Sequence, residues 1–350
     1  MERPCVRVPR EAGEETRQAL AEAGLLDDEY EIVVEDGALY LPVTDREAAS
    51  EGYEVVTRDV PVHDTQQTPA DRLGFDPSYE RLGDVAIVDE DDPERAREIG
   101  DAILDSDLPV RAVIDRASKV KGDLRVRDWS VVARADDGEN DRPVTETLHR
   151  EYGFEYLLDL SQVYFSPRLA TERHRVTEQV AAGERAVDMF AGVGPFAVPM
   201  AARGATVVGV DLNPVAVEYL RENARRNGVA DRVTAIEGDV RDVAADYADW
   251  ADRIVMNLPH SADEFLDAAV TLAADSEGRR PSGSRPKADD DCVIHYYDIQ
   301  HEDDPFGPGE RAIREAAAPA GYDVDVLTRH VVRSYAPHEL NVCLDVRLSR

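Results

Sequence analysis

The sequence predicts an α/β protein in which a mostly parallel, doubly wound sheet occupies the C-terminal half, with smaller α/β units before it. Between Glu184 and Pro214 a short apolar strand, a glycine turn, a helix and a second apolar strand follow one another directly, as in a βαβ unit. Apolar runs of strand length then alternate with helical patterns, which favours a parallel sheet. The last two runs, Val324–Arg333 and Leu340–Leu348, predict a closing pair that adds one antiparallel strand.

The N-terminal elements predict a domain of their own at residues 1–62. A strand, a helix and a hairpin around the turn dipeptide Asp36-Gly37 are expected at Cys5–Val8, Glu11–Leu26 and residues 31–43. Residues 63–77 are polar and contain two prolines, so they predict a linker.

Residues 78–165 predict a middle α/β domain, and residues 166–350 predict the domain of the large sheet. The middle domain has expected strands at Asp84–Val88, Val110–Asp115 and Leu124–Ala135, with a helix at Pro93–Leu104. The large domain starts with a helix near Thr171–Val180; its strands are expected at residues 186–190, 207–210, 233–236, 253–256 and 292–298, and its other helices at 195–202, 214–227, 263–274 and 309–318.

The charge is strongly acidic, with 40 basic and 73 acidic side chains and a formal net charge of −33. Such a balance usually argues against nucleic-acid partners, but it is also typical of a halophile's surface, where salt screens the repulsion. We favour the second interpretation because the acidic residues are spread through every segment. Three scattered cysteines, a charged N-terminus and the lack of a long apolar run predict a cytoplasmic protein without a membrane segment.

The glycine turn carries the first functional signal. Gly192 and Gly194 follow the first strand, and Asp211 ends the second strand, where a carboxylate can accept hydrogen bonds from ribose hydroxyls. The turn reads D-x-F-A-G-x-G, so the dinucleotide fingerprint G-x-G-x-x-G is incomplete. Asp188 would repel a pyrophosphate but would tolerate a cationic nucleoside without phosphate, such as S-adenosylmethionine (AdoMet). The string resembles motif I of class I AdoMet-dependent methyltransferases; the alternative is a βαβ turn without a ligand.

Four polar residues fall at the carboxyl ends of the predicted strands, where such sheets bind ligands: Asp188, Asp211, Asp239 and Asn257. We expect Asp188 and the Gly192–Gly194 backbone to face the methionine part of AdoMet, and Asp239 to accept from the adenine amino group. The apolar residues Phe190, Leu212 and Val240 complete the predicted cofactor site.

Asn257-Leu258-Pro259-His260 resembles the N/D-P-P-Y/F motif of methyltransferases that act on planar nitrogens of bases. Asn257 offers both a donor and an acceptor, and Pro259 stiffens the turn. Leu258 and His260 depart from the motif, and the alternative is a strand end with an Asn-initiated turn.

Five strings together resemble the tRNA (guanine-N1)-methyltransferases of archaea and eukaryotes: YFSPRLATERHRV, DMFAGVGPF, DLNPVAVEYLRENARRN, NLPHSADEFLDAA and RSYAPHELNVCLDV. The resemblance covers residues 78–350, and residues 1–62 are similar to that family's small domain that contacts the outer corner of tRNA. It implies a class I methyltransferase with a Rossmann-like, seven-stranded sheet. It also implies AdoMet as cofactor, no metal, a monomer, and tRNA with guanine at position 37 as substrate.

The resemblance also implies roles for single residues. Glu172 corresponds to the family's general base, which takes the proton from guanine N1. Arg125 matches a G-x-x-R string whose arginine stabilises charge on guanine O6, with Arg127 as a rival. Asn257 orients the base, and the remaining substrate-binding residues are Tyr164, Arg168, Arg173 and Pro259. Basic residues in 116–127 and 168–175 are expected to form a strip that holds tRNA phosphates.

Three alternatives stay open. Relatives in wybutosine synthesis transfer the aminocarboxypropyl arm of AdoMet, or methylate a carbon, on the same nucleotide; the Asn257-Leu258-Pro259 string favours transfer to nitrogen. A non-catalytic RNA-binding protein is disfavoured because the nucleoside-site residues are intact. A nicotinamide-dependent reduction is disfavoured by the incomplete fingerprint and by Asp188.

Overall fold

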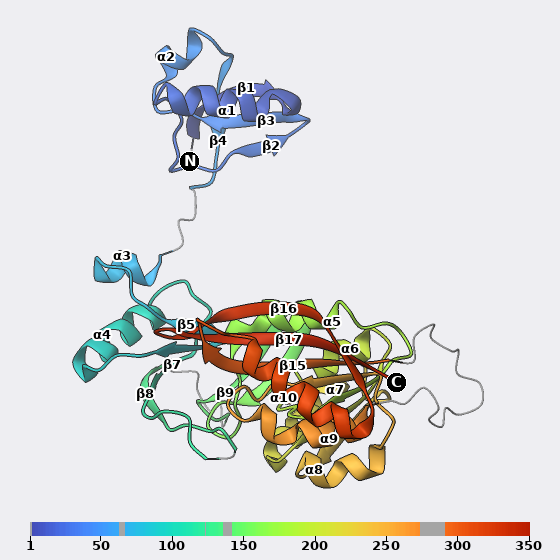
Figure 1. Ribbon diagram of the computed structural model, residues 1–350. Helices are drawn as coiled ribbons and strands as arrows, with labels where there is room; N and C mark the ends of the chain where they lie inside the picture. Colours follow the sequence, from blue (N-terminus) through green and yellow to red (C-terminus); the bar gives the residue numbers. More distant parts are fainter. Residues whose placement is uncertain (1, 63–66, 123, 136–141, 274–290) are drawn as a thin grey trace. The chain divides into compact units, whose positions relative to one another are not determined.

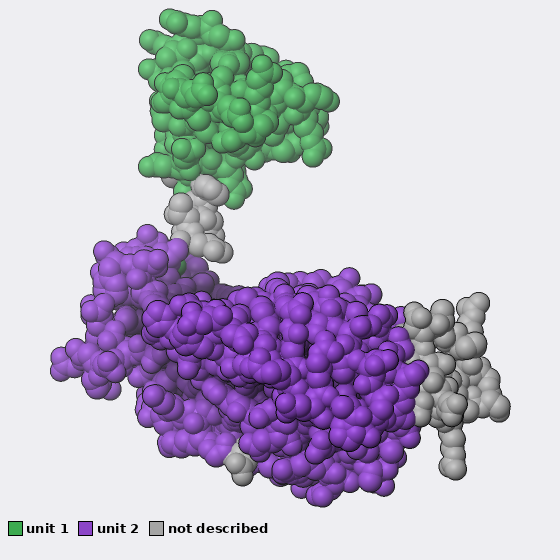
Figure 2. Space-filling model, in the orientation of Figure 1, with its two compact units in different colours: residues 1–67 green, residues 68–350 purple. Residues whose placement is uncertain are grey.

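A computed structural model describes residues 2–62, 67–122, 124–135, 142–273 and 291–350. The chain divides into two compact units, residues 1–67 and 68–350 (Figure 2). Among the described helices, none combines the length and the apolar character that crossing a membrane requires. The described 3-10 turns are Arg10–Ala12, Pro167–Leu169, Ala244–Tyr247, Ala262–Phe265 and Ala318–Ala320.

The first unit is a four-stranded antiparallel sheet with two helices. The sheet order is β2-β3-β1-β4. Asp36 and Gly37 both take positive φ, which confirms the predicted hairpin turn. Val6, Leu20 and Leu41 form its buried centre. The elements are β1 Glu2–Pro9, α1 Gly13–Glu22, β2 Val33–Glu35, β3 Ala38–Pro42, α2 Arg46–Ser50 and β4 Val55–Asp59.

The second unit begins with a four-stranded mixed sheet in the order β5-β6-β7-β8. The strand expected from Leu124 begins only at Trp129, because Gly122 and Arg125 take positive φ and turn the chain. A hairpin of β9 (Glu146–Glu151) and β10 (Phe154–Asp159), which the sequence analysis did not predict, follows. The other elements are α3 Pro69–Leu73, β5 Glu80–Leu82, β6 Val85–Val88, α4 Pro93–Leu104, β7 Ala112–Arg116 and β8 Trp129–Arg134.

The large sheet has seven strands in the order β13-β12-β11-β14-β15-β17-β16. Strands β11 to β15 pair in parallel, and β17 runs antiparallel to both β15 and β16. The predicted doubly wound sheet with one antiparallel strand is therefore confirmed. The strands are β11 Arg185–Asp188, β12 Thr206–Asp211, β13 Val233–Glu237, β14 Arg253–Met256, β15 Cys292–His301, β16 Asp323–Ala336 and β17 Glu339–Ser349.

Helices cover both faces of this sheet (Figure 1). Neighbouring strand residues point to opposite faces, so Ala186 packs with one helix layer and Val187 with the other. The first layer holds α5 Ala170–Thr177, α6 Ala197–Ala202 and α7 Pro214–Arg226; the second holds α8 Val240–Val243, α9 Leu266–Leu272 and α10 Gly307–Ala317.

The first layer also joins the smaller sheet to the large one. Leu82 and Ile114, from the middle segment, belong to the same buried cluster as Val176 and Ala186. The division of this unit at residues 165 and 166 stays a prediction. The same holds for the linker at 63–77, of which residues 63–66 lie outside the described residues and residues 69–73 form α3.

Candidate active site

The turn after β11 is shaped by two glycines at positive φ. Gly192 has φ 51° and Gly194 has φ 95°. A Cβ atom built on Gly194 would lie 2.5 Å from Leu220 Cδ1 of α7. The glycine therefore lets the turn pack directly on the helix, and the backbone N–H of Gly192 remains available to a carboxylate.

Asp211, at the end of β12, ties this turn to the next helix. Its Oδ2 accepts a hydrogen bond from the Gly192 N–H at 2.7 Å, and its Oδ1 accepts one from the Asn213 N–H at 2.8 Å. Burial raises the pKa of Asp211, and the two N–H groups oppose that shift. The carboxylate has further lone pairs on the side that faces a cavity.

That cavity lies at the carboxyl ends of the strands and has a volume of about 580 Å³. Nine of the predicted site residues line it: Arg125, Tyr164, Phe190, Gly192, Asp211, Leu212, Asp239, Val240 and Asn257. Its size and its mixed polar and apolar lining are those of a site for a nucleoside-sized ligand. We call it the nucleoside cavity.

The carboxylate of Asp239 already accepts hydrogen bonds from Arg241, a partner that the sequence did not predict. Its Oδ1 accepts from the Arg241 backbone N–H at 2.9 Å and caps α8, and the Arg241 side chain donates to the same carboxylate. The hydrogen bonds from Arg241 lower the pKa of Asp239. The guanidinium also lies 4.7 Å from the ring centroid of Phe265, so it covers one wall of the cavity.

A second cavity, of about 280 Å³, adjoins the first. The two share Arg125, Tyr164, Phe190, Gly192 and Asn257 among their lining residues, so Asn257 stands where they meet. We call this one the base cavity. It also contains the predicted residues Arg173 and Pro259, together with Arg127, His260, Arg333 and Tyr335.

His260 and Tyr335 close the outer side of the base cavity. The His260 Nε2 lies 3.0 Å from the Tyr335 hydroxyl, and the two rings meet edge to face. Burial, with the charge of Arg125, lowers the pKa of His260, which favours the neutral ring. Tyr335 and Arg333 belong to β16, which pairs antiparallel with β17. They begin the string RSYAPHELNVCLDV, but the sequence analysis assigned neither of them to the site.

Basic side chains gather beside the base cavity, as the two predicted basic stretches suggested. Arg116, Arg125, Arg127 and Arg168 line one depression together with Arg333. Both Arg116 and Arg168 form ion pairs with Glu80, whereas Arg125 sits at φ 56°, an uncommon backbone conformation that is enriched at functional sites.

Four predicted residues line neither of the two cavities: Gly194, Asp188, Arg168 and Glu172. Gly194 acts through the turn, and Asp188 is fully buried behind it. Neither oxygen of Asp188 has a hydrogen-bond partner of ordinary geometry in the described part of the chain. Burial raises the pKa of Asp188 to about 7, the Phe190 backbone N–H opposes that rise and the charge of Asp211 adds to it.

Glu172 does not line either cavity. It lies on α5, is 4 % exposed, and its carboxylate accepts from Arg175 Nε at 2.8 Å and Arg175 Nη2 at 2.9 Å. The Tyr297 hydroxyl donates to it at 2.8 Å. Tyr297 in turn lies against Phe196, which lines the base cavity, so Glu172 stands one residue layer behind that cavity. The sequence expectation that Glu172 faces the substrate is not met in this conformation, because Arg175 and Tyr297 hold its carboxylate.

Comparison with known proteins places this architecture in a family. Residues 147–279 match the TRM5/TYW2 methyltransferase domain, and residues 5–51 match the tRNA methyltransferase 5 N-terminal domain. The chain is 39% identical to the tRNA (guanine(37)-N(1))-methyltransferase Trm5b of Pyrococcus abyssi, over 99% of both chains. It is 31% identical to the tRNA(Phe) (4-demethylwyosine(37)-C(7)) aminocarboxypropyltransferase of Pyrococcus horikoshii, over 77% of this chain and 88% of the other.

Solved structures agree. The crystal structure of Pyrococcus abyssi Trm5b is similar at a TM-score of 0.68 and 37% identity, covering 99% of this chain and 100% of that one. A complex of aTrm5 with tRNALeu is similar at a TM-score of 0.70 and 30% identity, covering 98% and 99%. By full-length similarity, N-terminal domain included, the chain belongs to the Trm5 family of AdoMet-dependent tRNA (guanine(37)-N(1))-methyltransferases.

Proposed function

We propose that this protein transfers the methyl group of AdoMet to N1 of guanine 37 in tRNA. The observation that carries the proposal is the meeting of the nucleoside cavity and the base cavity at Asn257. Direct transfer needs the methyl donor and the acceptor nitrogen in contact, and two cavities that open onto one side chain supply that arrangement. The activity of two relatives, both tRNA (guanine(37)-N(1))-methyltransferases, agrees with it.

The nucleoside cavity would hold AdoMet. Asp211 would accept from the ribose hydroxyls, and Asp239 from the adenine amino group once that group displaces Arg241. Phe190, Leu212 and Val240 would contact the rings. Asp188 would balance the positive methionine end of AdoMet from behind the glycine turn.

The base cavity would hold the guanine. Asn257 offers a donor and an acceptor to its edge, and Tyr164 and Pro259 bound the space beside it. Arg125, which reaches both cavities, would stabilise the negative charge that develops on O6, with Arg127 as the alternative donor. Arg173 would form part of the wall of the base cavity, and Arg168 would bound the adjoining basic depression.

The reaction needs the proton on guanine N1 to be removed. In the proposed step the N1 electron pair forms a bond to the methyl carbon, the bond between that carbon and sulfur breaks, and sulfur keeps its electron pair as a neutral thioether. Glu172 would take the N1 proton. Because Arg175 and Tyr297 hold its carboxylate in this conformation, the step requires Glu172 to exchange those partners for the guanine.

The test measures whether the protein transfers a methyl group from AdoMet to tRNA, and to which nucleotide. Purified protein is incubated with AdoMet and tRNA transcripts that carry either guanine or adenine at position 37, and the nucleotide is mapped by mass spectrometry. We expect a methyl group on N1 of guanine 37 and none on adenine. Addition of an aminocarboxypropyl group would instead identify the activity of the Pyrococcus horikoshii relative, and the lack of any label on RNA would refute the proposal.

A second measurement addresses the proton acceptor. Glu172→Gln keeps the shape of the side chain but cannot accept the proton, so single-turnover methylation should slow by about a hundredfold or more. AdoMet affinity should stay near that of the wild type, since Glu172 lies outside the nucleoside cavity. An undiminished rate across pH would remove Glu172 from the mechanism.

We further propose a monomeric enzyme of the cytoplasm that works best at high potassium. A chain with a net charge of −33 repels tRNA at low ionic strength, except near the basic depression around Arg125. Inhibition by potassium at every concentration would contradict this expectation.

A further inference from the structure

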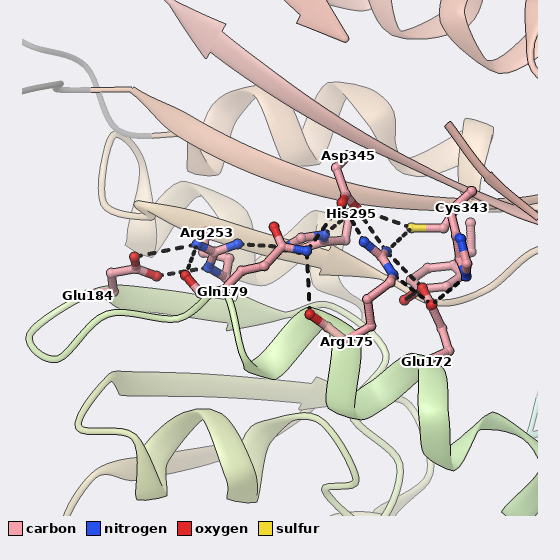
Figure 3. A network of polar contacts seen from close by, with 10 residues as sticks. Glu172, Arg175, Gln179, Glu184, Arg253, His295, Cys343 and Asp345 are labelled. Carbon is pink, nitrogen blue, oxygen red and sulfur yellow. Dashed lines mark hydrogen bonds and ion pairs between the residues drawn. The ribbon is translucent and has the colours of Figure 1, made fainter. Parts of the chain in front are cut away.

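Behind the base cavity lies a buried polar network that joins α5 to the large sheet (Figure 3). Its centre is the guanidinium of Arg175, which two carboxylates share. Arg175 donates from Nε and Nη2 to Glu172, and from Nη1 to Asp345 at 2.6 Å and Nη2 to Asp345 at 3.1 Å. Glu172 and Asp345 are 4 % and 1 % exposed, so water competes little for these contacts.

Asp345 is itself held by His295, which contacts the same carboxylate oxygen, Oδ1, as Arg175 Nη2. His295 Nδ1 lies 2.6 Å from Asp345 Oδ1, and Arg253 Nη1 lies 2.7 Å from His295 Nε2. An arginine can only donate, so His295 Nε2 accepts and its proton resides on Nδ1, which donates to Asp345. Arg253 is anchored by Glu184 at 2.8 Å. His295 is therefore held in one neutral tautomer, and burial lowers its pKa in agreement with that state.

Within the described residues, four elements contribute titratable groups around Glu172. These are Arg175 from α5, Tyr297 from β15, His330 from β16, and Cys343 and Asp345 from β17. Burial raises the pKa of both Tyr297 and Cys343 well above the ordinary values, so the phenol and the thiol stay neutral. Burial alone would raise the pKa of Asp345, but hydrogen bonds from His295 and Arg175 hold it far below its ordinary value. Arg175, whose side chain is 23% exposed, is thus a partly buried cation between two buried anions.

The shared cation has a consequence for the movement of Glu172. Removing one partner from a buried ion pair is costly because it leaves an uncompensated charge. If Glu172 leaves Arg175, the guanidinium still keeps two hydrogen bonds to Asp345, which His295 holds in place. The cost of releasing Glu172 is therefore reduced by Asp345.

We propose that Arg175, anchored by Asp345 and His295, is a positioning residue that stores Glu172 as a carboxylate behind the base cavity and lets it leave for the substrate. This inference rests on the proposed function, in which Glu172 takes the N1 proton. It assigns to Asp345, in the closing strand of the sheet, a part in the reaction although it lies outside both cavities.

The test compares Arg175→Met, Arg175→Lys and Asp345→Asn in single-turnover methylation over a range of pH. Without the guanidinium the buried carboxyl favours its neutral form, so Arg175→Met should move the acid-side midpoint of the rate profile up by about 1–3 pH units. Arg175→Lys keeps the charge and should restore much of the profile. Asp345→Asn leaves Glu172 as the sole anion on Arg175, so transfer should slow by about tenfold or more at every pH, with no recovery at high pH.

The matched control is Arg185→Met. Arg185 forms a comparable bidentate ion pair with Asp252 where β11 of the same sheet begins, and it touches neither cavity. This variant should lose stability but keep the wild-type pH profile. AdoMet affinity, measured by calorimetry, should be the same in all variants.

The outcomes separate the two proposals. A wild-type protein that leaves guanine 37 unmodified, or Glu172→Gln at full rate, refutes the proposed function. If Glu172→Gln is slow while Arg175→Met and Asp345→Asn share the wild-type profile, the positioning role alone is refuted. Equal losses of rate and AdoMet affinity would show a merely structural role. If Arg175→Met does not fold, Arg175→Lys and Asp345→Asn decide by the same criteria.

Discussion

Asp188 provides the sharpest test of the electrostatics behind the glycine turn. Its carboxyl is completely buried at the end of β11, and neither oxygen has a partner of ordinary geometry within the described chain. Burial raises its pKa from 3.8 to about 7. The perturbation is Asp188→Asn, which keeps the shape and removes the ionisation.

The sign of the effect follows from proton linkage. Between pH 3.8 and about 7 the unfolded chain has lost the Asp188 proton while the folded chain keeps it, so the folded state binds more protons and stability falls as pH rises. A difference of about three pKa units corresponds to about 4 kcal/mol. Relative to the wild type, Asp188→Asn should be close in stability near pH 4 and more stable by up to about 4 kcal/mol above pH 7.

The assay is urea unfolding without AdoMet, at a series of pH values and constant high potassium. Both tryptophans of the chain, Trp129 and Trp250, lie in residues 68–350, so their fluorescence reports the unit that contains Asp188. Comparing variant with wild type cancels the titration of the other carboxylates. Parallel stability curves for the two proteins between pH 4 and 8 would refute the reasoning.

Three further predictions concern the same unit. Asp211→Asn should weaken AdoMet binding about tenfold or more, because one amide oxygen replaces a carboxylate that already serves two N–H groups; unchanged affinity by calorimetry would contradict the ribose role. Gly194→Ala should cost about 1–3 kcal/mol, since the new Cβ meets Leu220 at 2.5 Å on a φ of 95°; an unaltered urea midpoint would contradict it. Arg173→Met leaves Glu151 buried without its guanidinium and should cost about 3–5 kcal/mol; replacing both residues by methionine should recover part of that loss.

Much of the fold could be predicted because local pattern and backbone topology decide it. The helix at Pro93–Leu104 and the strand at Arg253–Met256 occur at the predicted residues, since a proline start and a run of buried apolar residues are local signals. Asp211 and Asn257 could be placed near one another because the tips of parallel strands meet at one edge. The hairpin at residues 146–159 was missed, since its turn uses Tyr152 at φ 48° in place of a usual turn dipeptide.

The sequence by itself determined the order of strands and helices, the glycine turn and the set of residues at the strand tips, because these depend on spacing along the chain. Only the tertiary structure decided which charges meet. Arg175 and Asp345 are 170 residues apart, and β17 brings them together beneath α5. Whether the Glu172 carboxylate faces the substrate or a guanidinium therefore depends on side chains from distant strands. These side chains act over a few ångströms, and no local sequence pattern shows which of them will lie that close.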